Sequence, residues 1–463
     1  MEYKSELSTK ITPRLIIHGG AGNILPSNLP PAKYKAYHDA LLTILSNTHY
    51  YLEQGNDALD TVTYAVTQLE NNALFNSGHG AVFTREGINE LEASVMVSRG
   101  KKKRGVGLMG LQHVKNPIKL AREMLIRGED DIEGGNGEHR GALVSNNIMR
   151  KSSGAQGHSQ IHKFSAEKLA EEWGLEMVTP DYFFVQTRWD EHISGLAREK
   201  SGSGHATWDA MEFVPQGTCG AVCLDADGVC ATATSTGGMT NKLTGRIGDT
   251  PTLGAGFWAE EWEEDAMSRE ELLLRRPGPG LILSETLKGL MADCLPSLSM
   301  YSPIPANVEH LSIQKGDKLI RSAAMSGTGN GDSFLRINAV RTASAIARYR
   351  GVTVQQGLSD VTGPGGELVK SAGPRWKKTG EGEGGIIGVE CGVVVGEDGQ
   401  KKTATSSVVY DYNCGGMFRA AVDDHGKAVF RVWSPEQHEG LEKYEGEGKQ
   451  YELRQWRDEK PPL

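Results

Sequence analysis

The segment 217–251 constrains the fold more than any other stretch of the chain. Its sequence, GTCGAVCLDADGVCATATSTGGMTNKLTGRIGDTP, places alternating β-forming residues on both sides of a turn that contains Asp227-Gly228. This pattern predicts two short strands joined as a hairpin. Thr218 opens the first strand and residues 234–236 close the second, so two hydroxyl clusters are expected at the same end of one sheet.

A Gly-rich loop follows the hairpin and holds one cation and one anion, Arg246 and Asp249. A guanidinium binds a carboxylate through two hydrogen bonds, and an aspartate accepts hydrogen bonds from an ammonium group. The two side chains therefore suit the zwitterion of a free amino acid. A mutual surface salt bridge is the alternative, and it would contribute little to stability.

Thr218 becomes a competent nucleophile if the chain is cut just before it. A threonine hydroxyl needs a neighbouring base, and a freed α-amino group with a pKa of about 7.7 to 8.0 is one known solution. Gly217 allows the strained backbone from which the hydroxyl attacks its own preceding carbonyl, and the cut would yield residues 1–217 and 218–463. The alternatives are a strand threonine that only packs its methyl group, and Cys219 as the nucleophile, because thiols are intrinsically more reactive.

Five motifs in fixed order resemble a known family. They are IIHGGAG at 16–22, LENNALFNSGHGAVFT at 69–84, ELEASVM at 90–96, the segment from GTCGAV to LGAG at 217–256, and SGTGNGD at 326–332. Together they resemble the plant-type L-asparaginases and isoaspartyl peptidases, which are N-terminal-threonine hydrolases of the Ntn superfamily. The resemblance implies an α+β fold: a single domain over 1–463 built as a four-layer αββα sandwich, with two antiparallel sheets between helical layers.

The resemblance also implies roles for individual residues of these motifs. Thr218 is the implied nucleophile, and Thr236 orients it. Thr328 and the amide of Gly329 form the implied oxyanion hole, and Asn76 lies near the nucleophile.

The implied substrate-binding residues lie in the last two motifs. Arg246 binds the α-carboxylate and Asp249 the α-ammonium, while Gly329 and the carbonyl of Gly331 help to hold the substrate.

The motif at 69–84 is implied to wrap Na⁺ or K⁺ through main-chain oxygens, a donor type that suits hard cations. The implied residues are Leu69, Glu70, Asn72, Phe75, Ser77 and His79. An Asx-type loop without a cation is the alternative for this segment.

The implied activity is hydrolysis of L-asparagine to L-aspartate and ammonia, and of β-aspartyl (isoaspartyl) dipeptides, after self-cleavage at Gly217–Thr218. No cofactor takes part in this chemistry, the partners are small-molecule substrates, and the processed chains are expected to form a homodimer. Two enzymatic alternatives also use an N-terminal threonine: a taspase-like endopeptidase and a glycosylasparaginase-like amidase. An unprocessed binding protein without catalytic activity is the alternative from another class.

Composition excludes some classes of partner. The formal net charge of −9 argues against a surface for nucleic acid or anionic membranes. The chain has no apolar run near the roughly 18 residues that a membrane span requires. Its start, MEYKSELSTKITPR, lacks an apolar signal core, so a cytoplasmic location is expected.

Local patterns predict the remaining elements. Residues 260–325 separate two motifs that the family joins by a short link, so they are expected to be a helical insertion broken by prolines. The polar segment 188–217 is expected to be a mobile arm, and the charged tail 434–463 to be frayed. Helices are predicted at 31–53, 57–70, 117–125, 165–173 and 333–349, and further strands at 15–18, 81–84, 90–98, 106–111, 384–395 and 406–412.

Overall fold

The computed structural model describes residues 9–101, 104–132, 155–207, 217–265, 316–434 and 440–458. The chain divides into two compact units. The larger unit comprises residues 11–261, 322–391 and 406–463, and the smaller comprises 1–10, 262–321 and 392–405. Every site residue that the sequence predicts lies in the larger unit.

A nine-stranded sheet forms the centre of the larger unit. Its order is β13-β12-β11-β1-β5-β6-β2-β3-β4, and the pairs are antiparallel except for β3 with β4. The strands are β1 (Arg14–Gly22), β2 (Leu91–Val97), β3 (Gly105–Leu111), β4 (Gln160–His162), β5 (Cys219–Leu224), β6 (Cys230–Thr236), β11 (Gly416–Val422), β12 (Ala428–Arg431) and β13 (Gln450–Tyr451). The predicted hairpin is confirmed, because β5 and β6 pair in antiparallel register from Cys219 opposite Ser235 to Leu224 opposite Cys230.

A second sheet has the order β10-β9-β8-β7. Its strands are β7 (Phe257–Asp265), β8 (Lys318–Gly329), β9 (Gly384–Val395) and β10 (Lys401–Tyr412). Within the larger unit, Ser326 of β8 contacts His18 of β1 and Thr234 of β6. The two sheets therefore face each other at this point.

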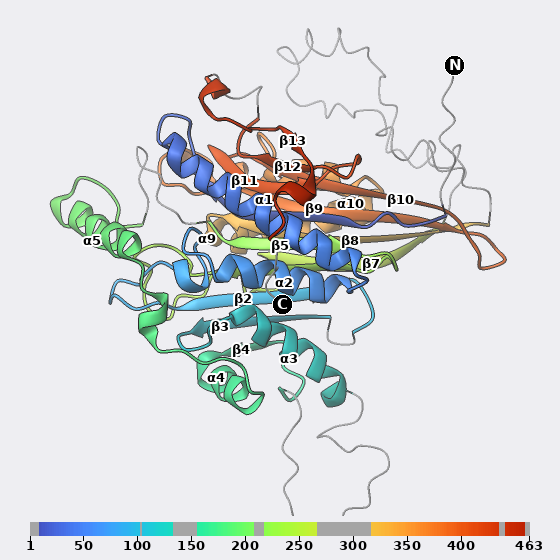
Figure 1. The fold of residues 1–463 in the computed structure, drawn as a ribbon, viewed down its shortest axis with the longest axis horizontal. Helices are drawn as coiled ribbons and strands as arrows, with labels where there is room; N and C mark the ends of the chain where they lie inside the picture. The colour runs from blue at the N-terminus through green and yellow to red at the C-terminus, as the bar shows by residue number, and fades with distance from the viewer. Residues whose placement is uncertain are drawn as a thin grey trace, which may run out of the picture. The chain divides into compact units, whose positions relative to one another are not determined.

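Helices α1 (Pro31–Glu53), α2 (Ala58–Glu70) and α3 (Pro117–Ile132) cover the nine-stranded sheet, and Figure 1 shows α1 and α2 lying across its strands. Asp57 caps α2 by accepting a hydrogen bond from the amide of Asp60. Buried aliphatic and aromatic side chains fill the space between these helices and the sheet, and this is the main hydrophobic core.

The other helices are shorter. They are α4 (Lys163–Glu172), α5 (Gln186–Ser201), α9 (Gly331–Ile337), α10 (Ala339–Arg350), α11 (Val354–Thr362) and α12 (Glu367–Ala372). Single 3-10 turns occur at Gly78–Gly80, Pro180–Phe183, Gly373–Arg375, Leu441–Lys443 and Leu453–Gln455.

The predicted mobile arm is wrong over much of its length, because residues 186–201 form α5. Arg188 and His192 are buried on this helix, and Arg188 donates hydrogen bonds to the carbonyls of Leu74 and Gly80. Asn241 donates to the carbonyls of His192 and Ala206. These bonds anchor a segment whose polar composition gave no sign of them. Residues 208–216 lie outside the described part of the chain.

The predicted frayed tail is also wrong over residues 440–458. Tyr444 is buried, and its hydroxyl donates to carbonyls of the segment before α1. Strand β13 extends the nine-stranded sheet, and the amide of Asp458 donates to Asn47 of α1. Aromatic side chains therefore hold a segment whose charge indicated the opposite. Residues 435–439 and 459–463 lie outside the described part.

Other boundaries differ from the predictions in smaller ways. Residues 81–84 form no strand, and α3 continues past Gly128. The helix predicted at 333–349 is divided into α9 and α10, because Asn338 adopts a left-handed conformation. Most of the predicted insertion, residues 266–315, lies outside the described part, so its helical character stays a prediction. Among the described residues, no helix combines the length and the apolarity that crossing a membrane would need.

Candidate active site

Thr218 lies immediately before β5, and its side chain is buried. Its hydroxyl oxygen Oγ1 is 3.3 Å from Oγ1 of Thr250. Gly217 packs against Gly20 of the β1 motif so closely that a Cβ atom on Gly217 would lie 2.4 Å from the Cα of Gly20. Only glycine fits before Thr218 without a shift of the neighbouring backbone.

A buried polar chain lies close to Thr218. Nε2 of His18 is 2.8 Å from Oγ of Ser326, which is 2.9 Å from Oγ1 of Thr234. Burial lowers the pKa of His18 to about 3, although a hydrogen bond with the Thr218 backbone acts in the opposite direction. His18 is therefore neutral at physiological pH, and it gives Thr218 polar surroundings without a charge.

Cys219 behaves as a core residue. Its Sγ donates a hydrogen bond to the carbonyl of Ser235 on β6, and the side chain is fully buried. Burial raises the pKa of this thiol above its usual value, so the reactive thiolate is suppressed. This environment favours Thr218 over its neighbour as the nucleophile.

Thr328 is located near the end of β8, where it meets the β1 motif. Its Oγ1 accepts a hydrogen bond of 3.1 Å from the amide of Ala21. The hydroxyl hydrogen of Thr328 therefore remains available to be donated, as an oxyanion hole requires. Gly329 follows with φ +145°, and a Cβ there would lie 2.4 Å from the carbonyl oxygen of Glu383.

Thr236 and Asn76 both bind the backbone that follows β6. Oγ1 of Thr236 accepts from the amide of Gly238 at 2.9 Å, and Nδ2 of Asn76 donates to the carbonyl of Gly238 at 2.7 Å. Oδ1 of Asn76 accepts from the amide of Val82 at 3.0 Å, so both ends of this amide are engaged. The hydroxyl contact to Thr218 comes instead from Thr250, which the sequence reasoning missed although it adjoins Asp249.

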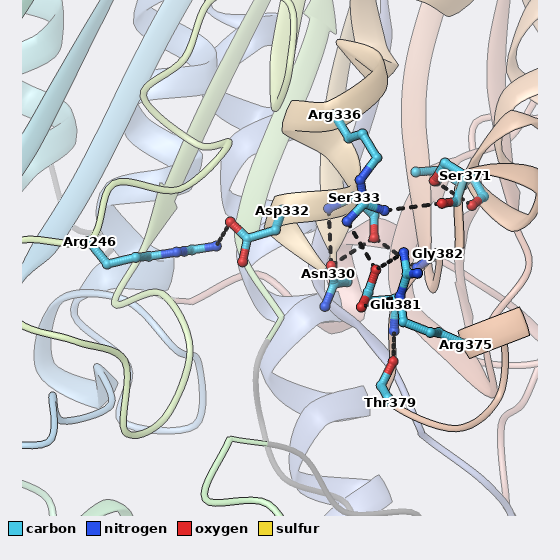
Figure 2. A network of polar contacts seen from close by, with 11 residues as sticks. Arg246, Asn330, Asp332, Ser333, Arg336, Ser371, Arg375, Thr379, Glu381 and Gly382 are labelled. Atoms are coloured by element: carbon cyan, nitrogen blue, oxygen red, sulfur yellow. Dashed lines mark hydrogen bonds and ion pairs between the residues drawn. The ribbon is translucent and has the colours of Figure 1, made fainter. Parts of the chain in front are cut away.

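Arg246, Asp249 and Gly331 converge at the start of α9. A Cβ on Gly331 would lie 2.5 Å from Oδ1 of Asp249 and 2.9 Å from Nη2 of Arg246. The ion-pair partner of Arg246 is Asp332, with Nη2 3.2 Å from Oδ1, as Figure 2 shows. The predicted substrate-binding residues are thus brought together, and the pairing of Arg246 differs from the mutual salt bridge that was the alternative.

Asp249 is buried, and burial raises its pKa to about 7. The charge of Arg246 acts in the opposite direction, while Glu92 of β2 and Asp332 raise the pKa further. Glu92 is a second residue that the sequence reasoning left without a role. Its carboxylate oxygen Oε1 accepts a 2.8 Å hydrogen bond from the amide of Gly248, inside the turn that carries Arg246 and Asp249.

A polar network supports the other side of the site (Figure 2). Asn330 caps α9 by accepting hydrogen bonds from the amide and the hydroxyl of Ser333. The same hydroxyl accepts from the amide of Gly382, and Glu381 binds both Arg336 and Arg375. These bonds fix the backbone that carries Thr328 to Asp332.

Two glycines of the loop after α2 lie close to main-chain carbonyls. A Cβ on Gly78 would lie 2.3 Å from the carbonyl oxygen of Glu70, and a Cβ on Gly80 would lie 2.1 Å from that of Phe75. The Ser77 hydroxyl contacts Ser235 Oγ at 2.5 Å. The other predicted cation ligands lie along the same loop, where Leu69 is buried, Asn72 Oδ1 accepts from the amide of Leu74, and His79 contacts the carbonyl of Tyr182.

The carboxylate of Glu70 anchors this loop. It accepts hydrogen bonds from Ser235, Asn116 and the amide of Ile118, and burial raises its pKa to about 7. In the described part of the chain, no group of three or more His, Cys, Asp or Glu side chains could hold a metal ion.

The arrangement can support acyl transfer. A hydroxyl at a glycine junction, a second hydroxyl whose hydrogen is available, and a neighbouring cation and anion lie in one compact unit.

Comparison with known proteins agrees with this chemistry. The sequence model of a family described as asparaginase matches residues 11–143 and 139–264. The isoaspartyl peptidase of Escherichia coli (strain K12) is 36% identical over 245 residues, which cover 53% of this chain and 67% of that protein. The probable isoaspartyl peptidase/L-asparaginase 2 of Arabidopsis thaliana is 26% identical over 442 residues, covering 90% of this chain and 98% of that protein. The isoaspartyl peptidase/L-asparaginase of Rattus norvegicus is 32% identical over 246 residues, which cover 53% of this chain and 62% of that protein.

Proposed function

Because this chain belongs to the asparaginase family of hydrolases, we propose that it cuts itself before Thr218 and then hydrolyses L-asparagine and β-aspartyl dipeptides. The convergence of Arg246, Asp249 and Gly331 is the observation that carries the proposal. It provides a cation, an anion and a close backbone approach for a substrate with a free α-carboxylate and α-ammonium.

Self-cleavage begins with attack of the Thr218 hydroxyl on the carbonyl carbon of Gly217. The peptide C–N bond breaks, the nitrogen takes up a proton as an amine, and Gly217 is left as an ester on Thr218. Water hydrolyses the ester and releases residues 1–217 and 218–463. The packing of Gly217 against Gly20 supports this step, because it requires a glycine, and a glycine has no side chain to block attack on its carbonyl carbon.

Turnover uses the α-amine that self-cleavage frees. The amine takes the proton of the Thr218 hydroxyl as its oxygen attacks the side-chain amide of the substrate. Thr328 and the amide of Gly329 stabilise the oxyanion, and the protonated amine returns its proton to the departing ammonia or amino acid. Water then hydrolyses the β-aspartyl ester by the same path in reverse.

The family also implies an alkali cation in the loop 69–80. The carbonyls of Glu70 and Phe75 are candidate ligands, because Gly78 and Gly80 lack the Cβ atoms that would lie 2.3 and 2.1 Å from these oxygens. The main-chain oxygens of Leu69, Glu70, Asn72, Phe75, Ser77 and His79 would hold Na⁺ or K⁺. The ion would fix the loop and, through Asn76, the backbone after β6.

Two structural expectations belong to the same proposal. A four-layer αββα order is supported by α1 and α2 on the nine-stranded sheet, and by Phe334 of α9 and Val340 of α10, which approach Gly327 of β8. We further propose that the processed pairs form a homodimer, which sedimentation of the purified protein would test. The proposed location of this dimer is the cytoplasm.

Denaturing electrophoresis, N-terminal sequencing and turnover of asparagine and β-Asp-Leu test the proposed function together. The wild-type protein is expected to give two chains, one of which begins TCGAV, and to release aspartate from both substrates. Thr218→Ala should give one uncut, inactive chain, and the matched variant Cys219→Val should retain both cutting and turnover. An uncut chain with full activity, or a cut chain without activity on either substrate, would contradict the proposal.

A further inference from the structure

Two glutamates at the start of β2, Glu90 just before the strand and Glu92 within it, hold the turn that carries Arg246. Oε2 of Glu90 accepts a hydrogen bond from the amide of Gly245 at 2.7 Å, and Oε1 of Glu92 accepts from the amide of Gly248 at 2.8 Å. Glu90 and Glu92 are 2% and 1% exposed. They bind the backbone on both sides of Arg246, so this turn is fixed by buried carboxylates.

The second oxygen of Glu92 has a different environment. Among the side chains that the structure describes, Oε2 of Glu92 and Oδ2 of Asp249 are buried atoms without a hydrogen bond. Oε2 of Glu92 and Nη1 of Arg246 lie 2.9 and 2.6 Å from the position that a Cβ on Gly248 would occupy. Both groups therefore lie against the same face of Gly248, next to Asp249. A buried charged oxygen without a partner is costly, which points to a ligand that supplies one.

The charges of the cluster favour a cation. Glu90, Glu92 and Asp249 are buried close to two cations, the buried Lys242 and the partly exposed Arg246. Nζ of Lys242 donates to the main-chain carbonyl of Glu90 at 2.9 Å. When all five groups are ionised, the cluster carries one excess negative charge. An ammonium group would neutralise this charge and donate to oxygens that have no other partner.

We propose that Glu92, together with Asp249, binds the α-ammonium of the substrate and so selects amino acids with a free α-amine. The inference rests on the proposed function, since it adds a residue to the same substrate site. Oε1 of Glu92 fixes the turn, and Oε2 accepts from the ammonium. A substrate whose α-nitrogen is missing, or lies within a peptide bond, would leave the one excess negative charge of the cluster without a counter-charge.

Competitive inhibition by L-aspartate and by succinate tests the inference, because the two ligands differ only in the ammonium group. In Glu92→Gln, the inhibition constant of L-aspartate should rise about 10-fold, while that of succinate stays constant or falls. Glu90→Gln is the matched control, because Glu90 binds the same turn but is not proposed to accept a hydrogen bond from the ammonium. Any effect of this control should be equal for both ligands.

Three outcomes decide the matter. A selective loss of L-aspartate inhibition in Glu92→Gln supports the inference, and an equal change for both ligands overturns it. Wild-type protein that hydrolyses neither asparagine nor β-aspartyl dipeptides overturns the proposed function itself, and the inference with it.

If Glu92→Gln does not fold, Glu92→Asp serves in its place, because it keeps the charge but withdraws it by one methylene. It should lower the preference for L-aspartate over succinate, and an unchanged preference would count against Glu92.

Discussion

Nη2 of Arg246 lies 3.2 Å from Oδ1 of Asp332, so the guanidinium proposed for the substrate carboxylate already has an anionic neighbour. Asp332 is 58% exposed and Arg246 is 18% exposed at the side chain. An ion pair with one solvated member is worth about 1 kcal/mol at most. The pair is weak enough for a substrate carboxylate to displace, which makes Asp332 a competitor for the site.

Asp332→Asn should therefore lower the KM for asparagine by up to about 5-fold and leave kcat unchanged. Steady-state kinetics at low ionic strength measure this effect, and Asp360→Asn, at a distant exposed ion pair with Arg350, is the control. A higher KM would show instead that Asp332 positions Arg246 for binding.

Thr250→Val removes the hydroxyl next to Thr218 and preserves side-chain shape. We expect kcat and the rate of self-cleavage to fall about 5- to 10-fold, because one hydrogen bond to the nucleophile contributes about 1 kcal/mol. Thr232→Val is the matched control, since the Thr232 hydroxyl is buried on β6 without a hydrogen bond among the described residues. Equal losses in both variants would mean that only packing is involved.

The raised pKa of Asp249 predicts a pH dependence of product binding. Below a pH of about 7 Asp249 takes up a proton and no longer attracts an ammonium, so the inhibition constant of L-aspartate should rise as the pH falls from 8 to 6. Arg246, Glu92 and Asp332 face the same group and shape this titration. Because the pKa of Asp249 is higher in the folded protein than in the unfolded chain, protonation of Asp249 stabilises the folded state. This contribution to the free energy of unfolding is present at low pH and is lost as the pH rises through about 7.

Asp249→Asn supplies the control for that titration. Inhibition by L-aspartate should be weak and nearly independent of pH between 6 and 8 in this variant. A persistent pH dependence would assign the titration to another group.

The cation site proposed for the loop 69–80 predicts that alkali cations stabilise the protein. The midpoint of thermal unfolding should be several degrees higher in NaCl or KCl than in choline chloride at equal ionic strength, because an ion that binds only the folded state raises its stability. Gly80→Ala should abolish this difference, because its Cβ would lie 2.1 Å from the carbonyl oxygen of Phe75. Gly204→Ala, which meets only a side-chain atom of Arg198 at 3.9 Å, should retain the difference. An unchanged response in Gly80→Ala would remove the cation from this loop.

Elements with a strong local pattern could be predicted from the sequence. The limits of α1 agree with the prediction, and the hairpin of β5 and β6 follows from its Asp-Gly turn. Helix α5 could not be predicted in this way, because Arg188 and His192 are polar residues that partners distant in the sequence bury. Composition reports the average solvation of a segment and gives no sign of such partners.

The residues of the candidate site also fall into those that a local pattern indicates and those that depend on distant contacts. Motifs singled out Thr218, Arg246 and Asp249 as candidates, because their neighbours along the chain are distinctive. Thr250 and Glu92 were given no role, since their contacts depend on the packing of separate segments. Asn338 illustrates this limit for the backbone, where one left-handed residue divides a helix that periodicity predicts as continuous.

The strand order of the nine-stranded sheet has a consequence for the two pieces that the cut would produce. β1 is hydrogen-bonded to β11 on one side and to β5 on the other, and β2 pairs with β6. Strands of the amino-terminal piece thus alternate with strands of the carboxy-terminal piece across one continuous hydrogen-bond ladder. The pieces are interleaved, and separating them would break the ladder at three junctions. Each piece made alone would expose unpaired strand edges, so the two should be stable only when they have folded together as one polypeptide.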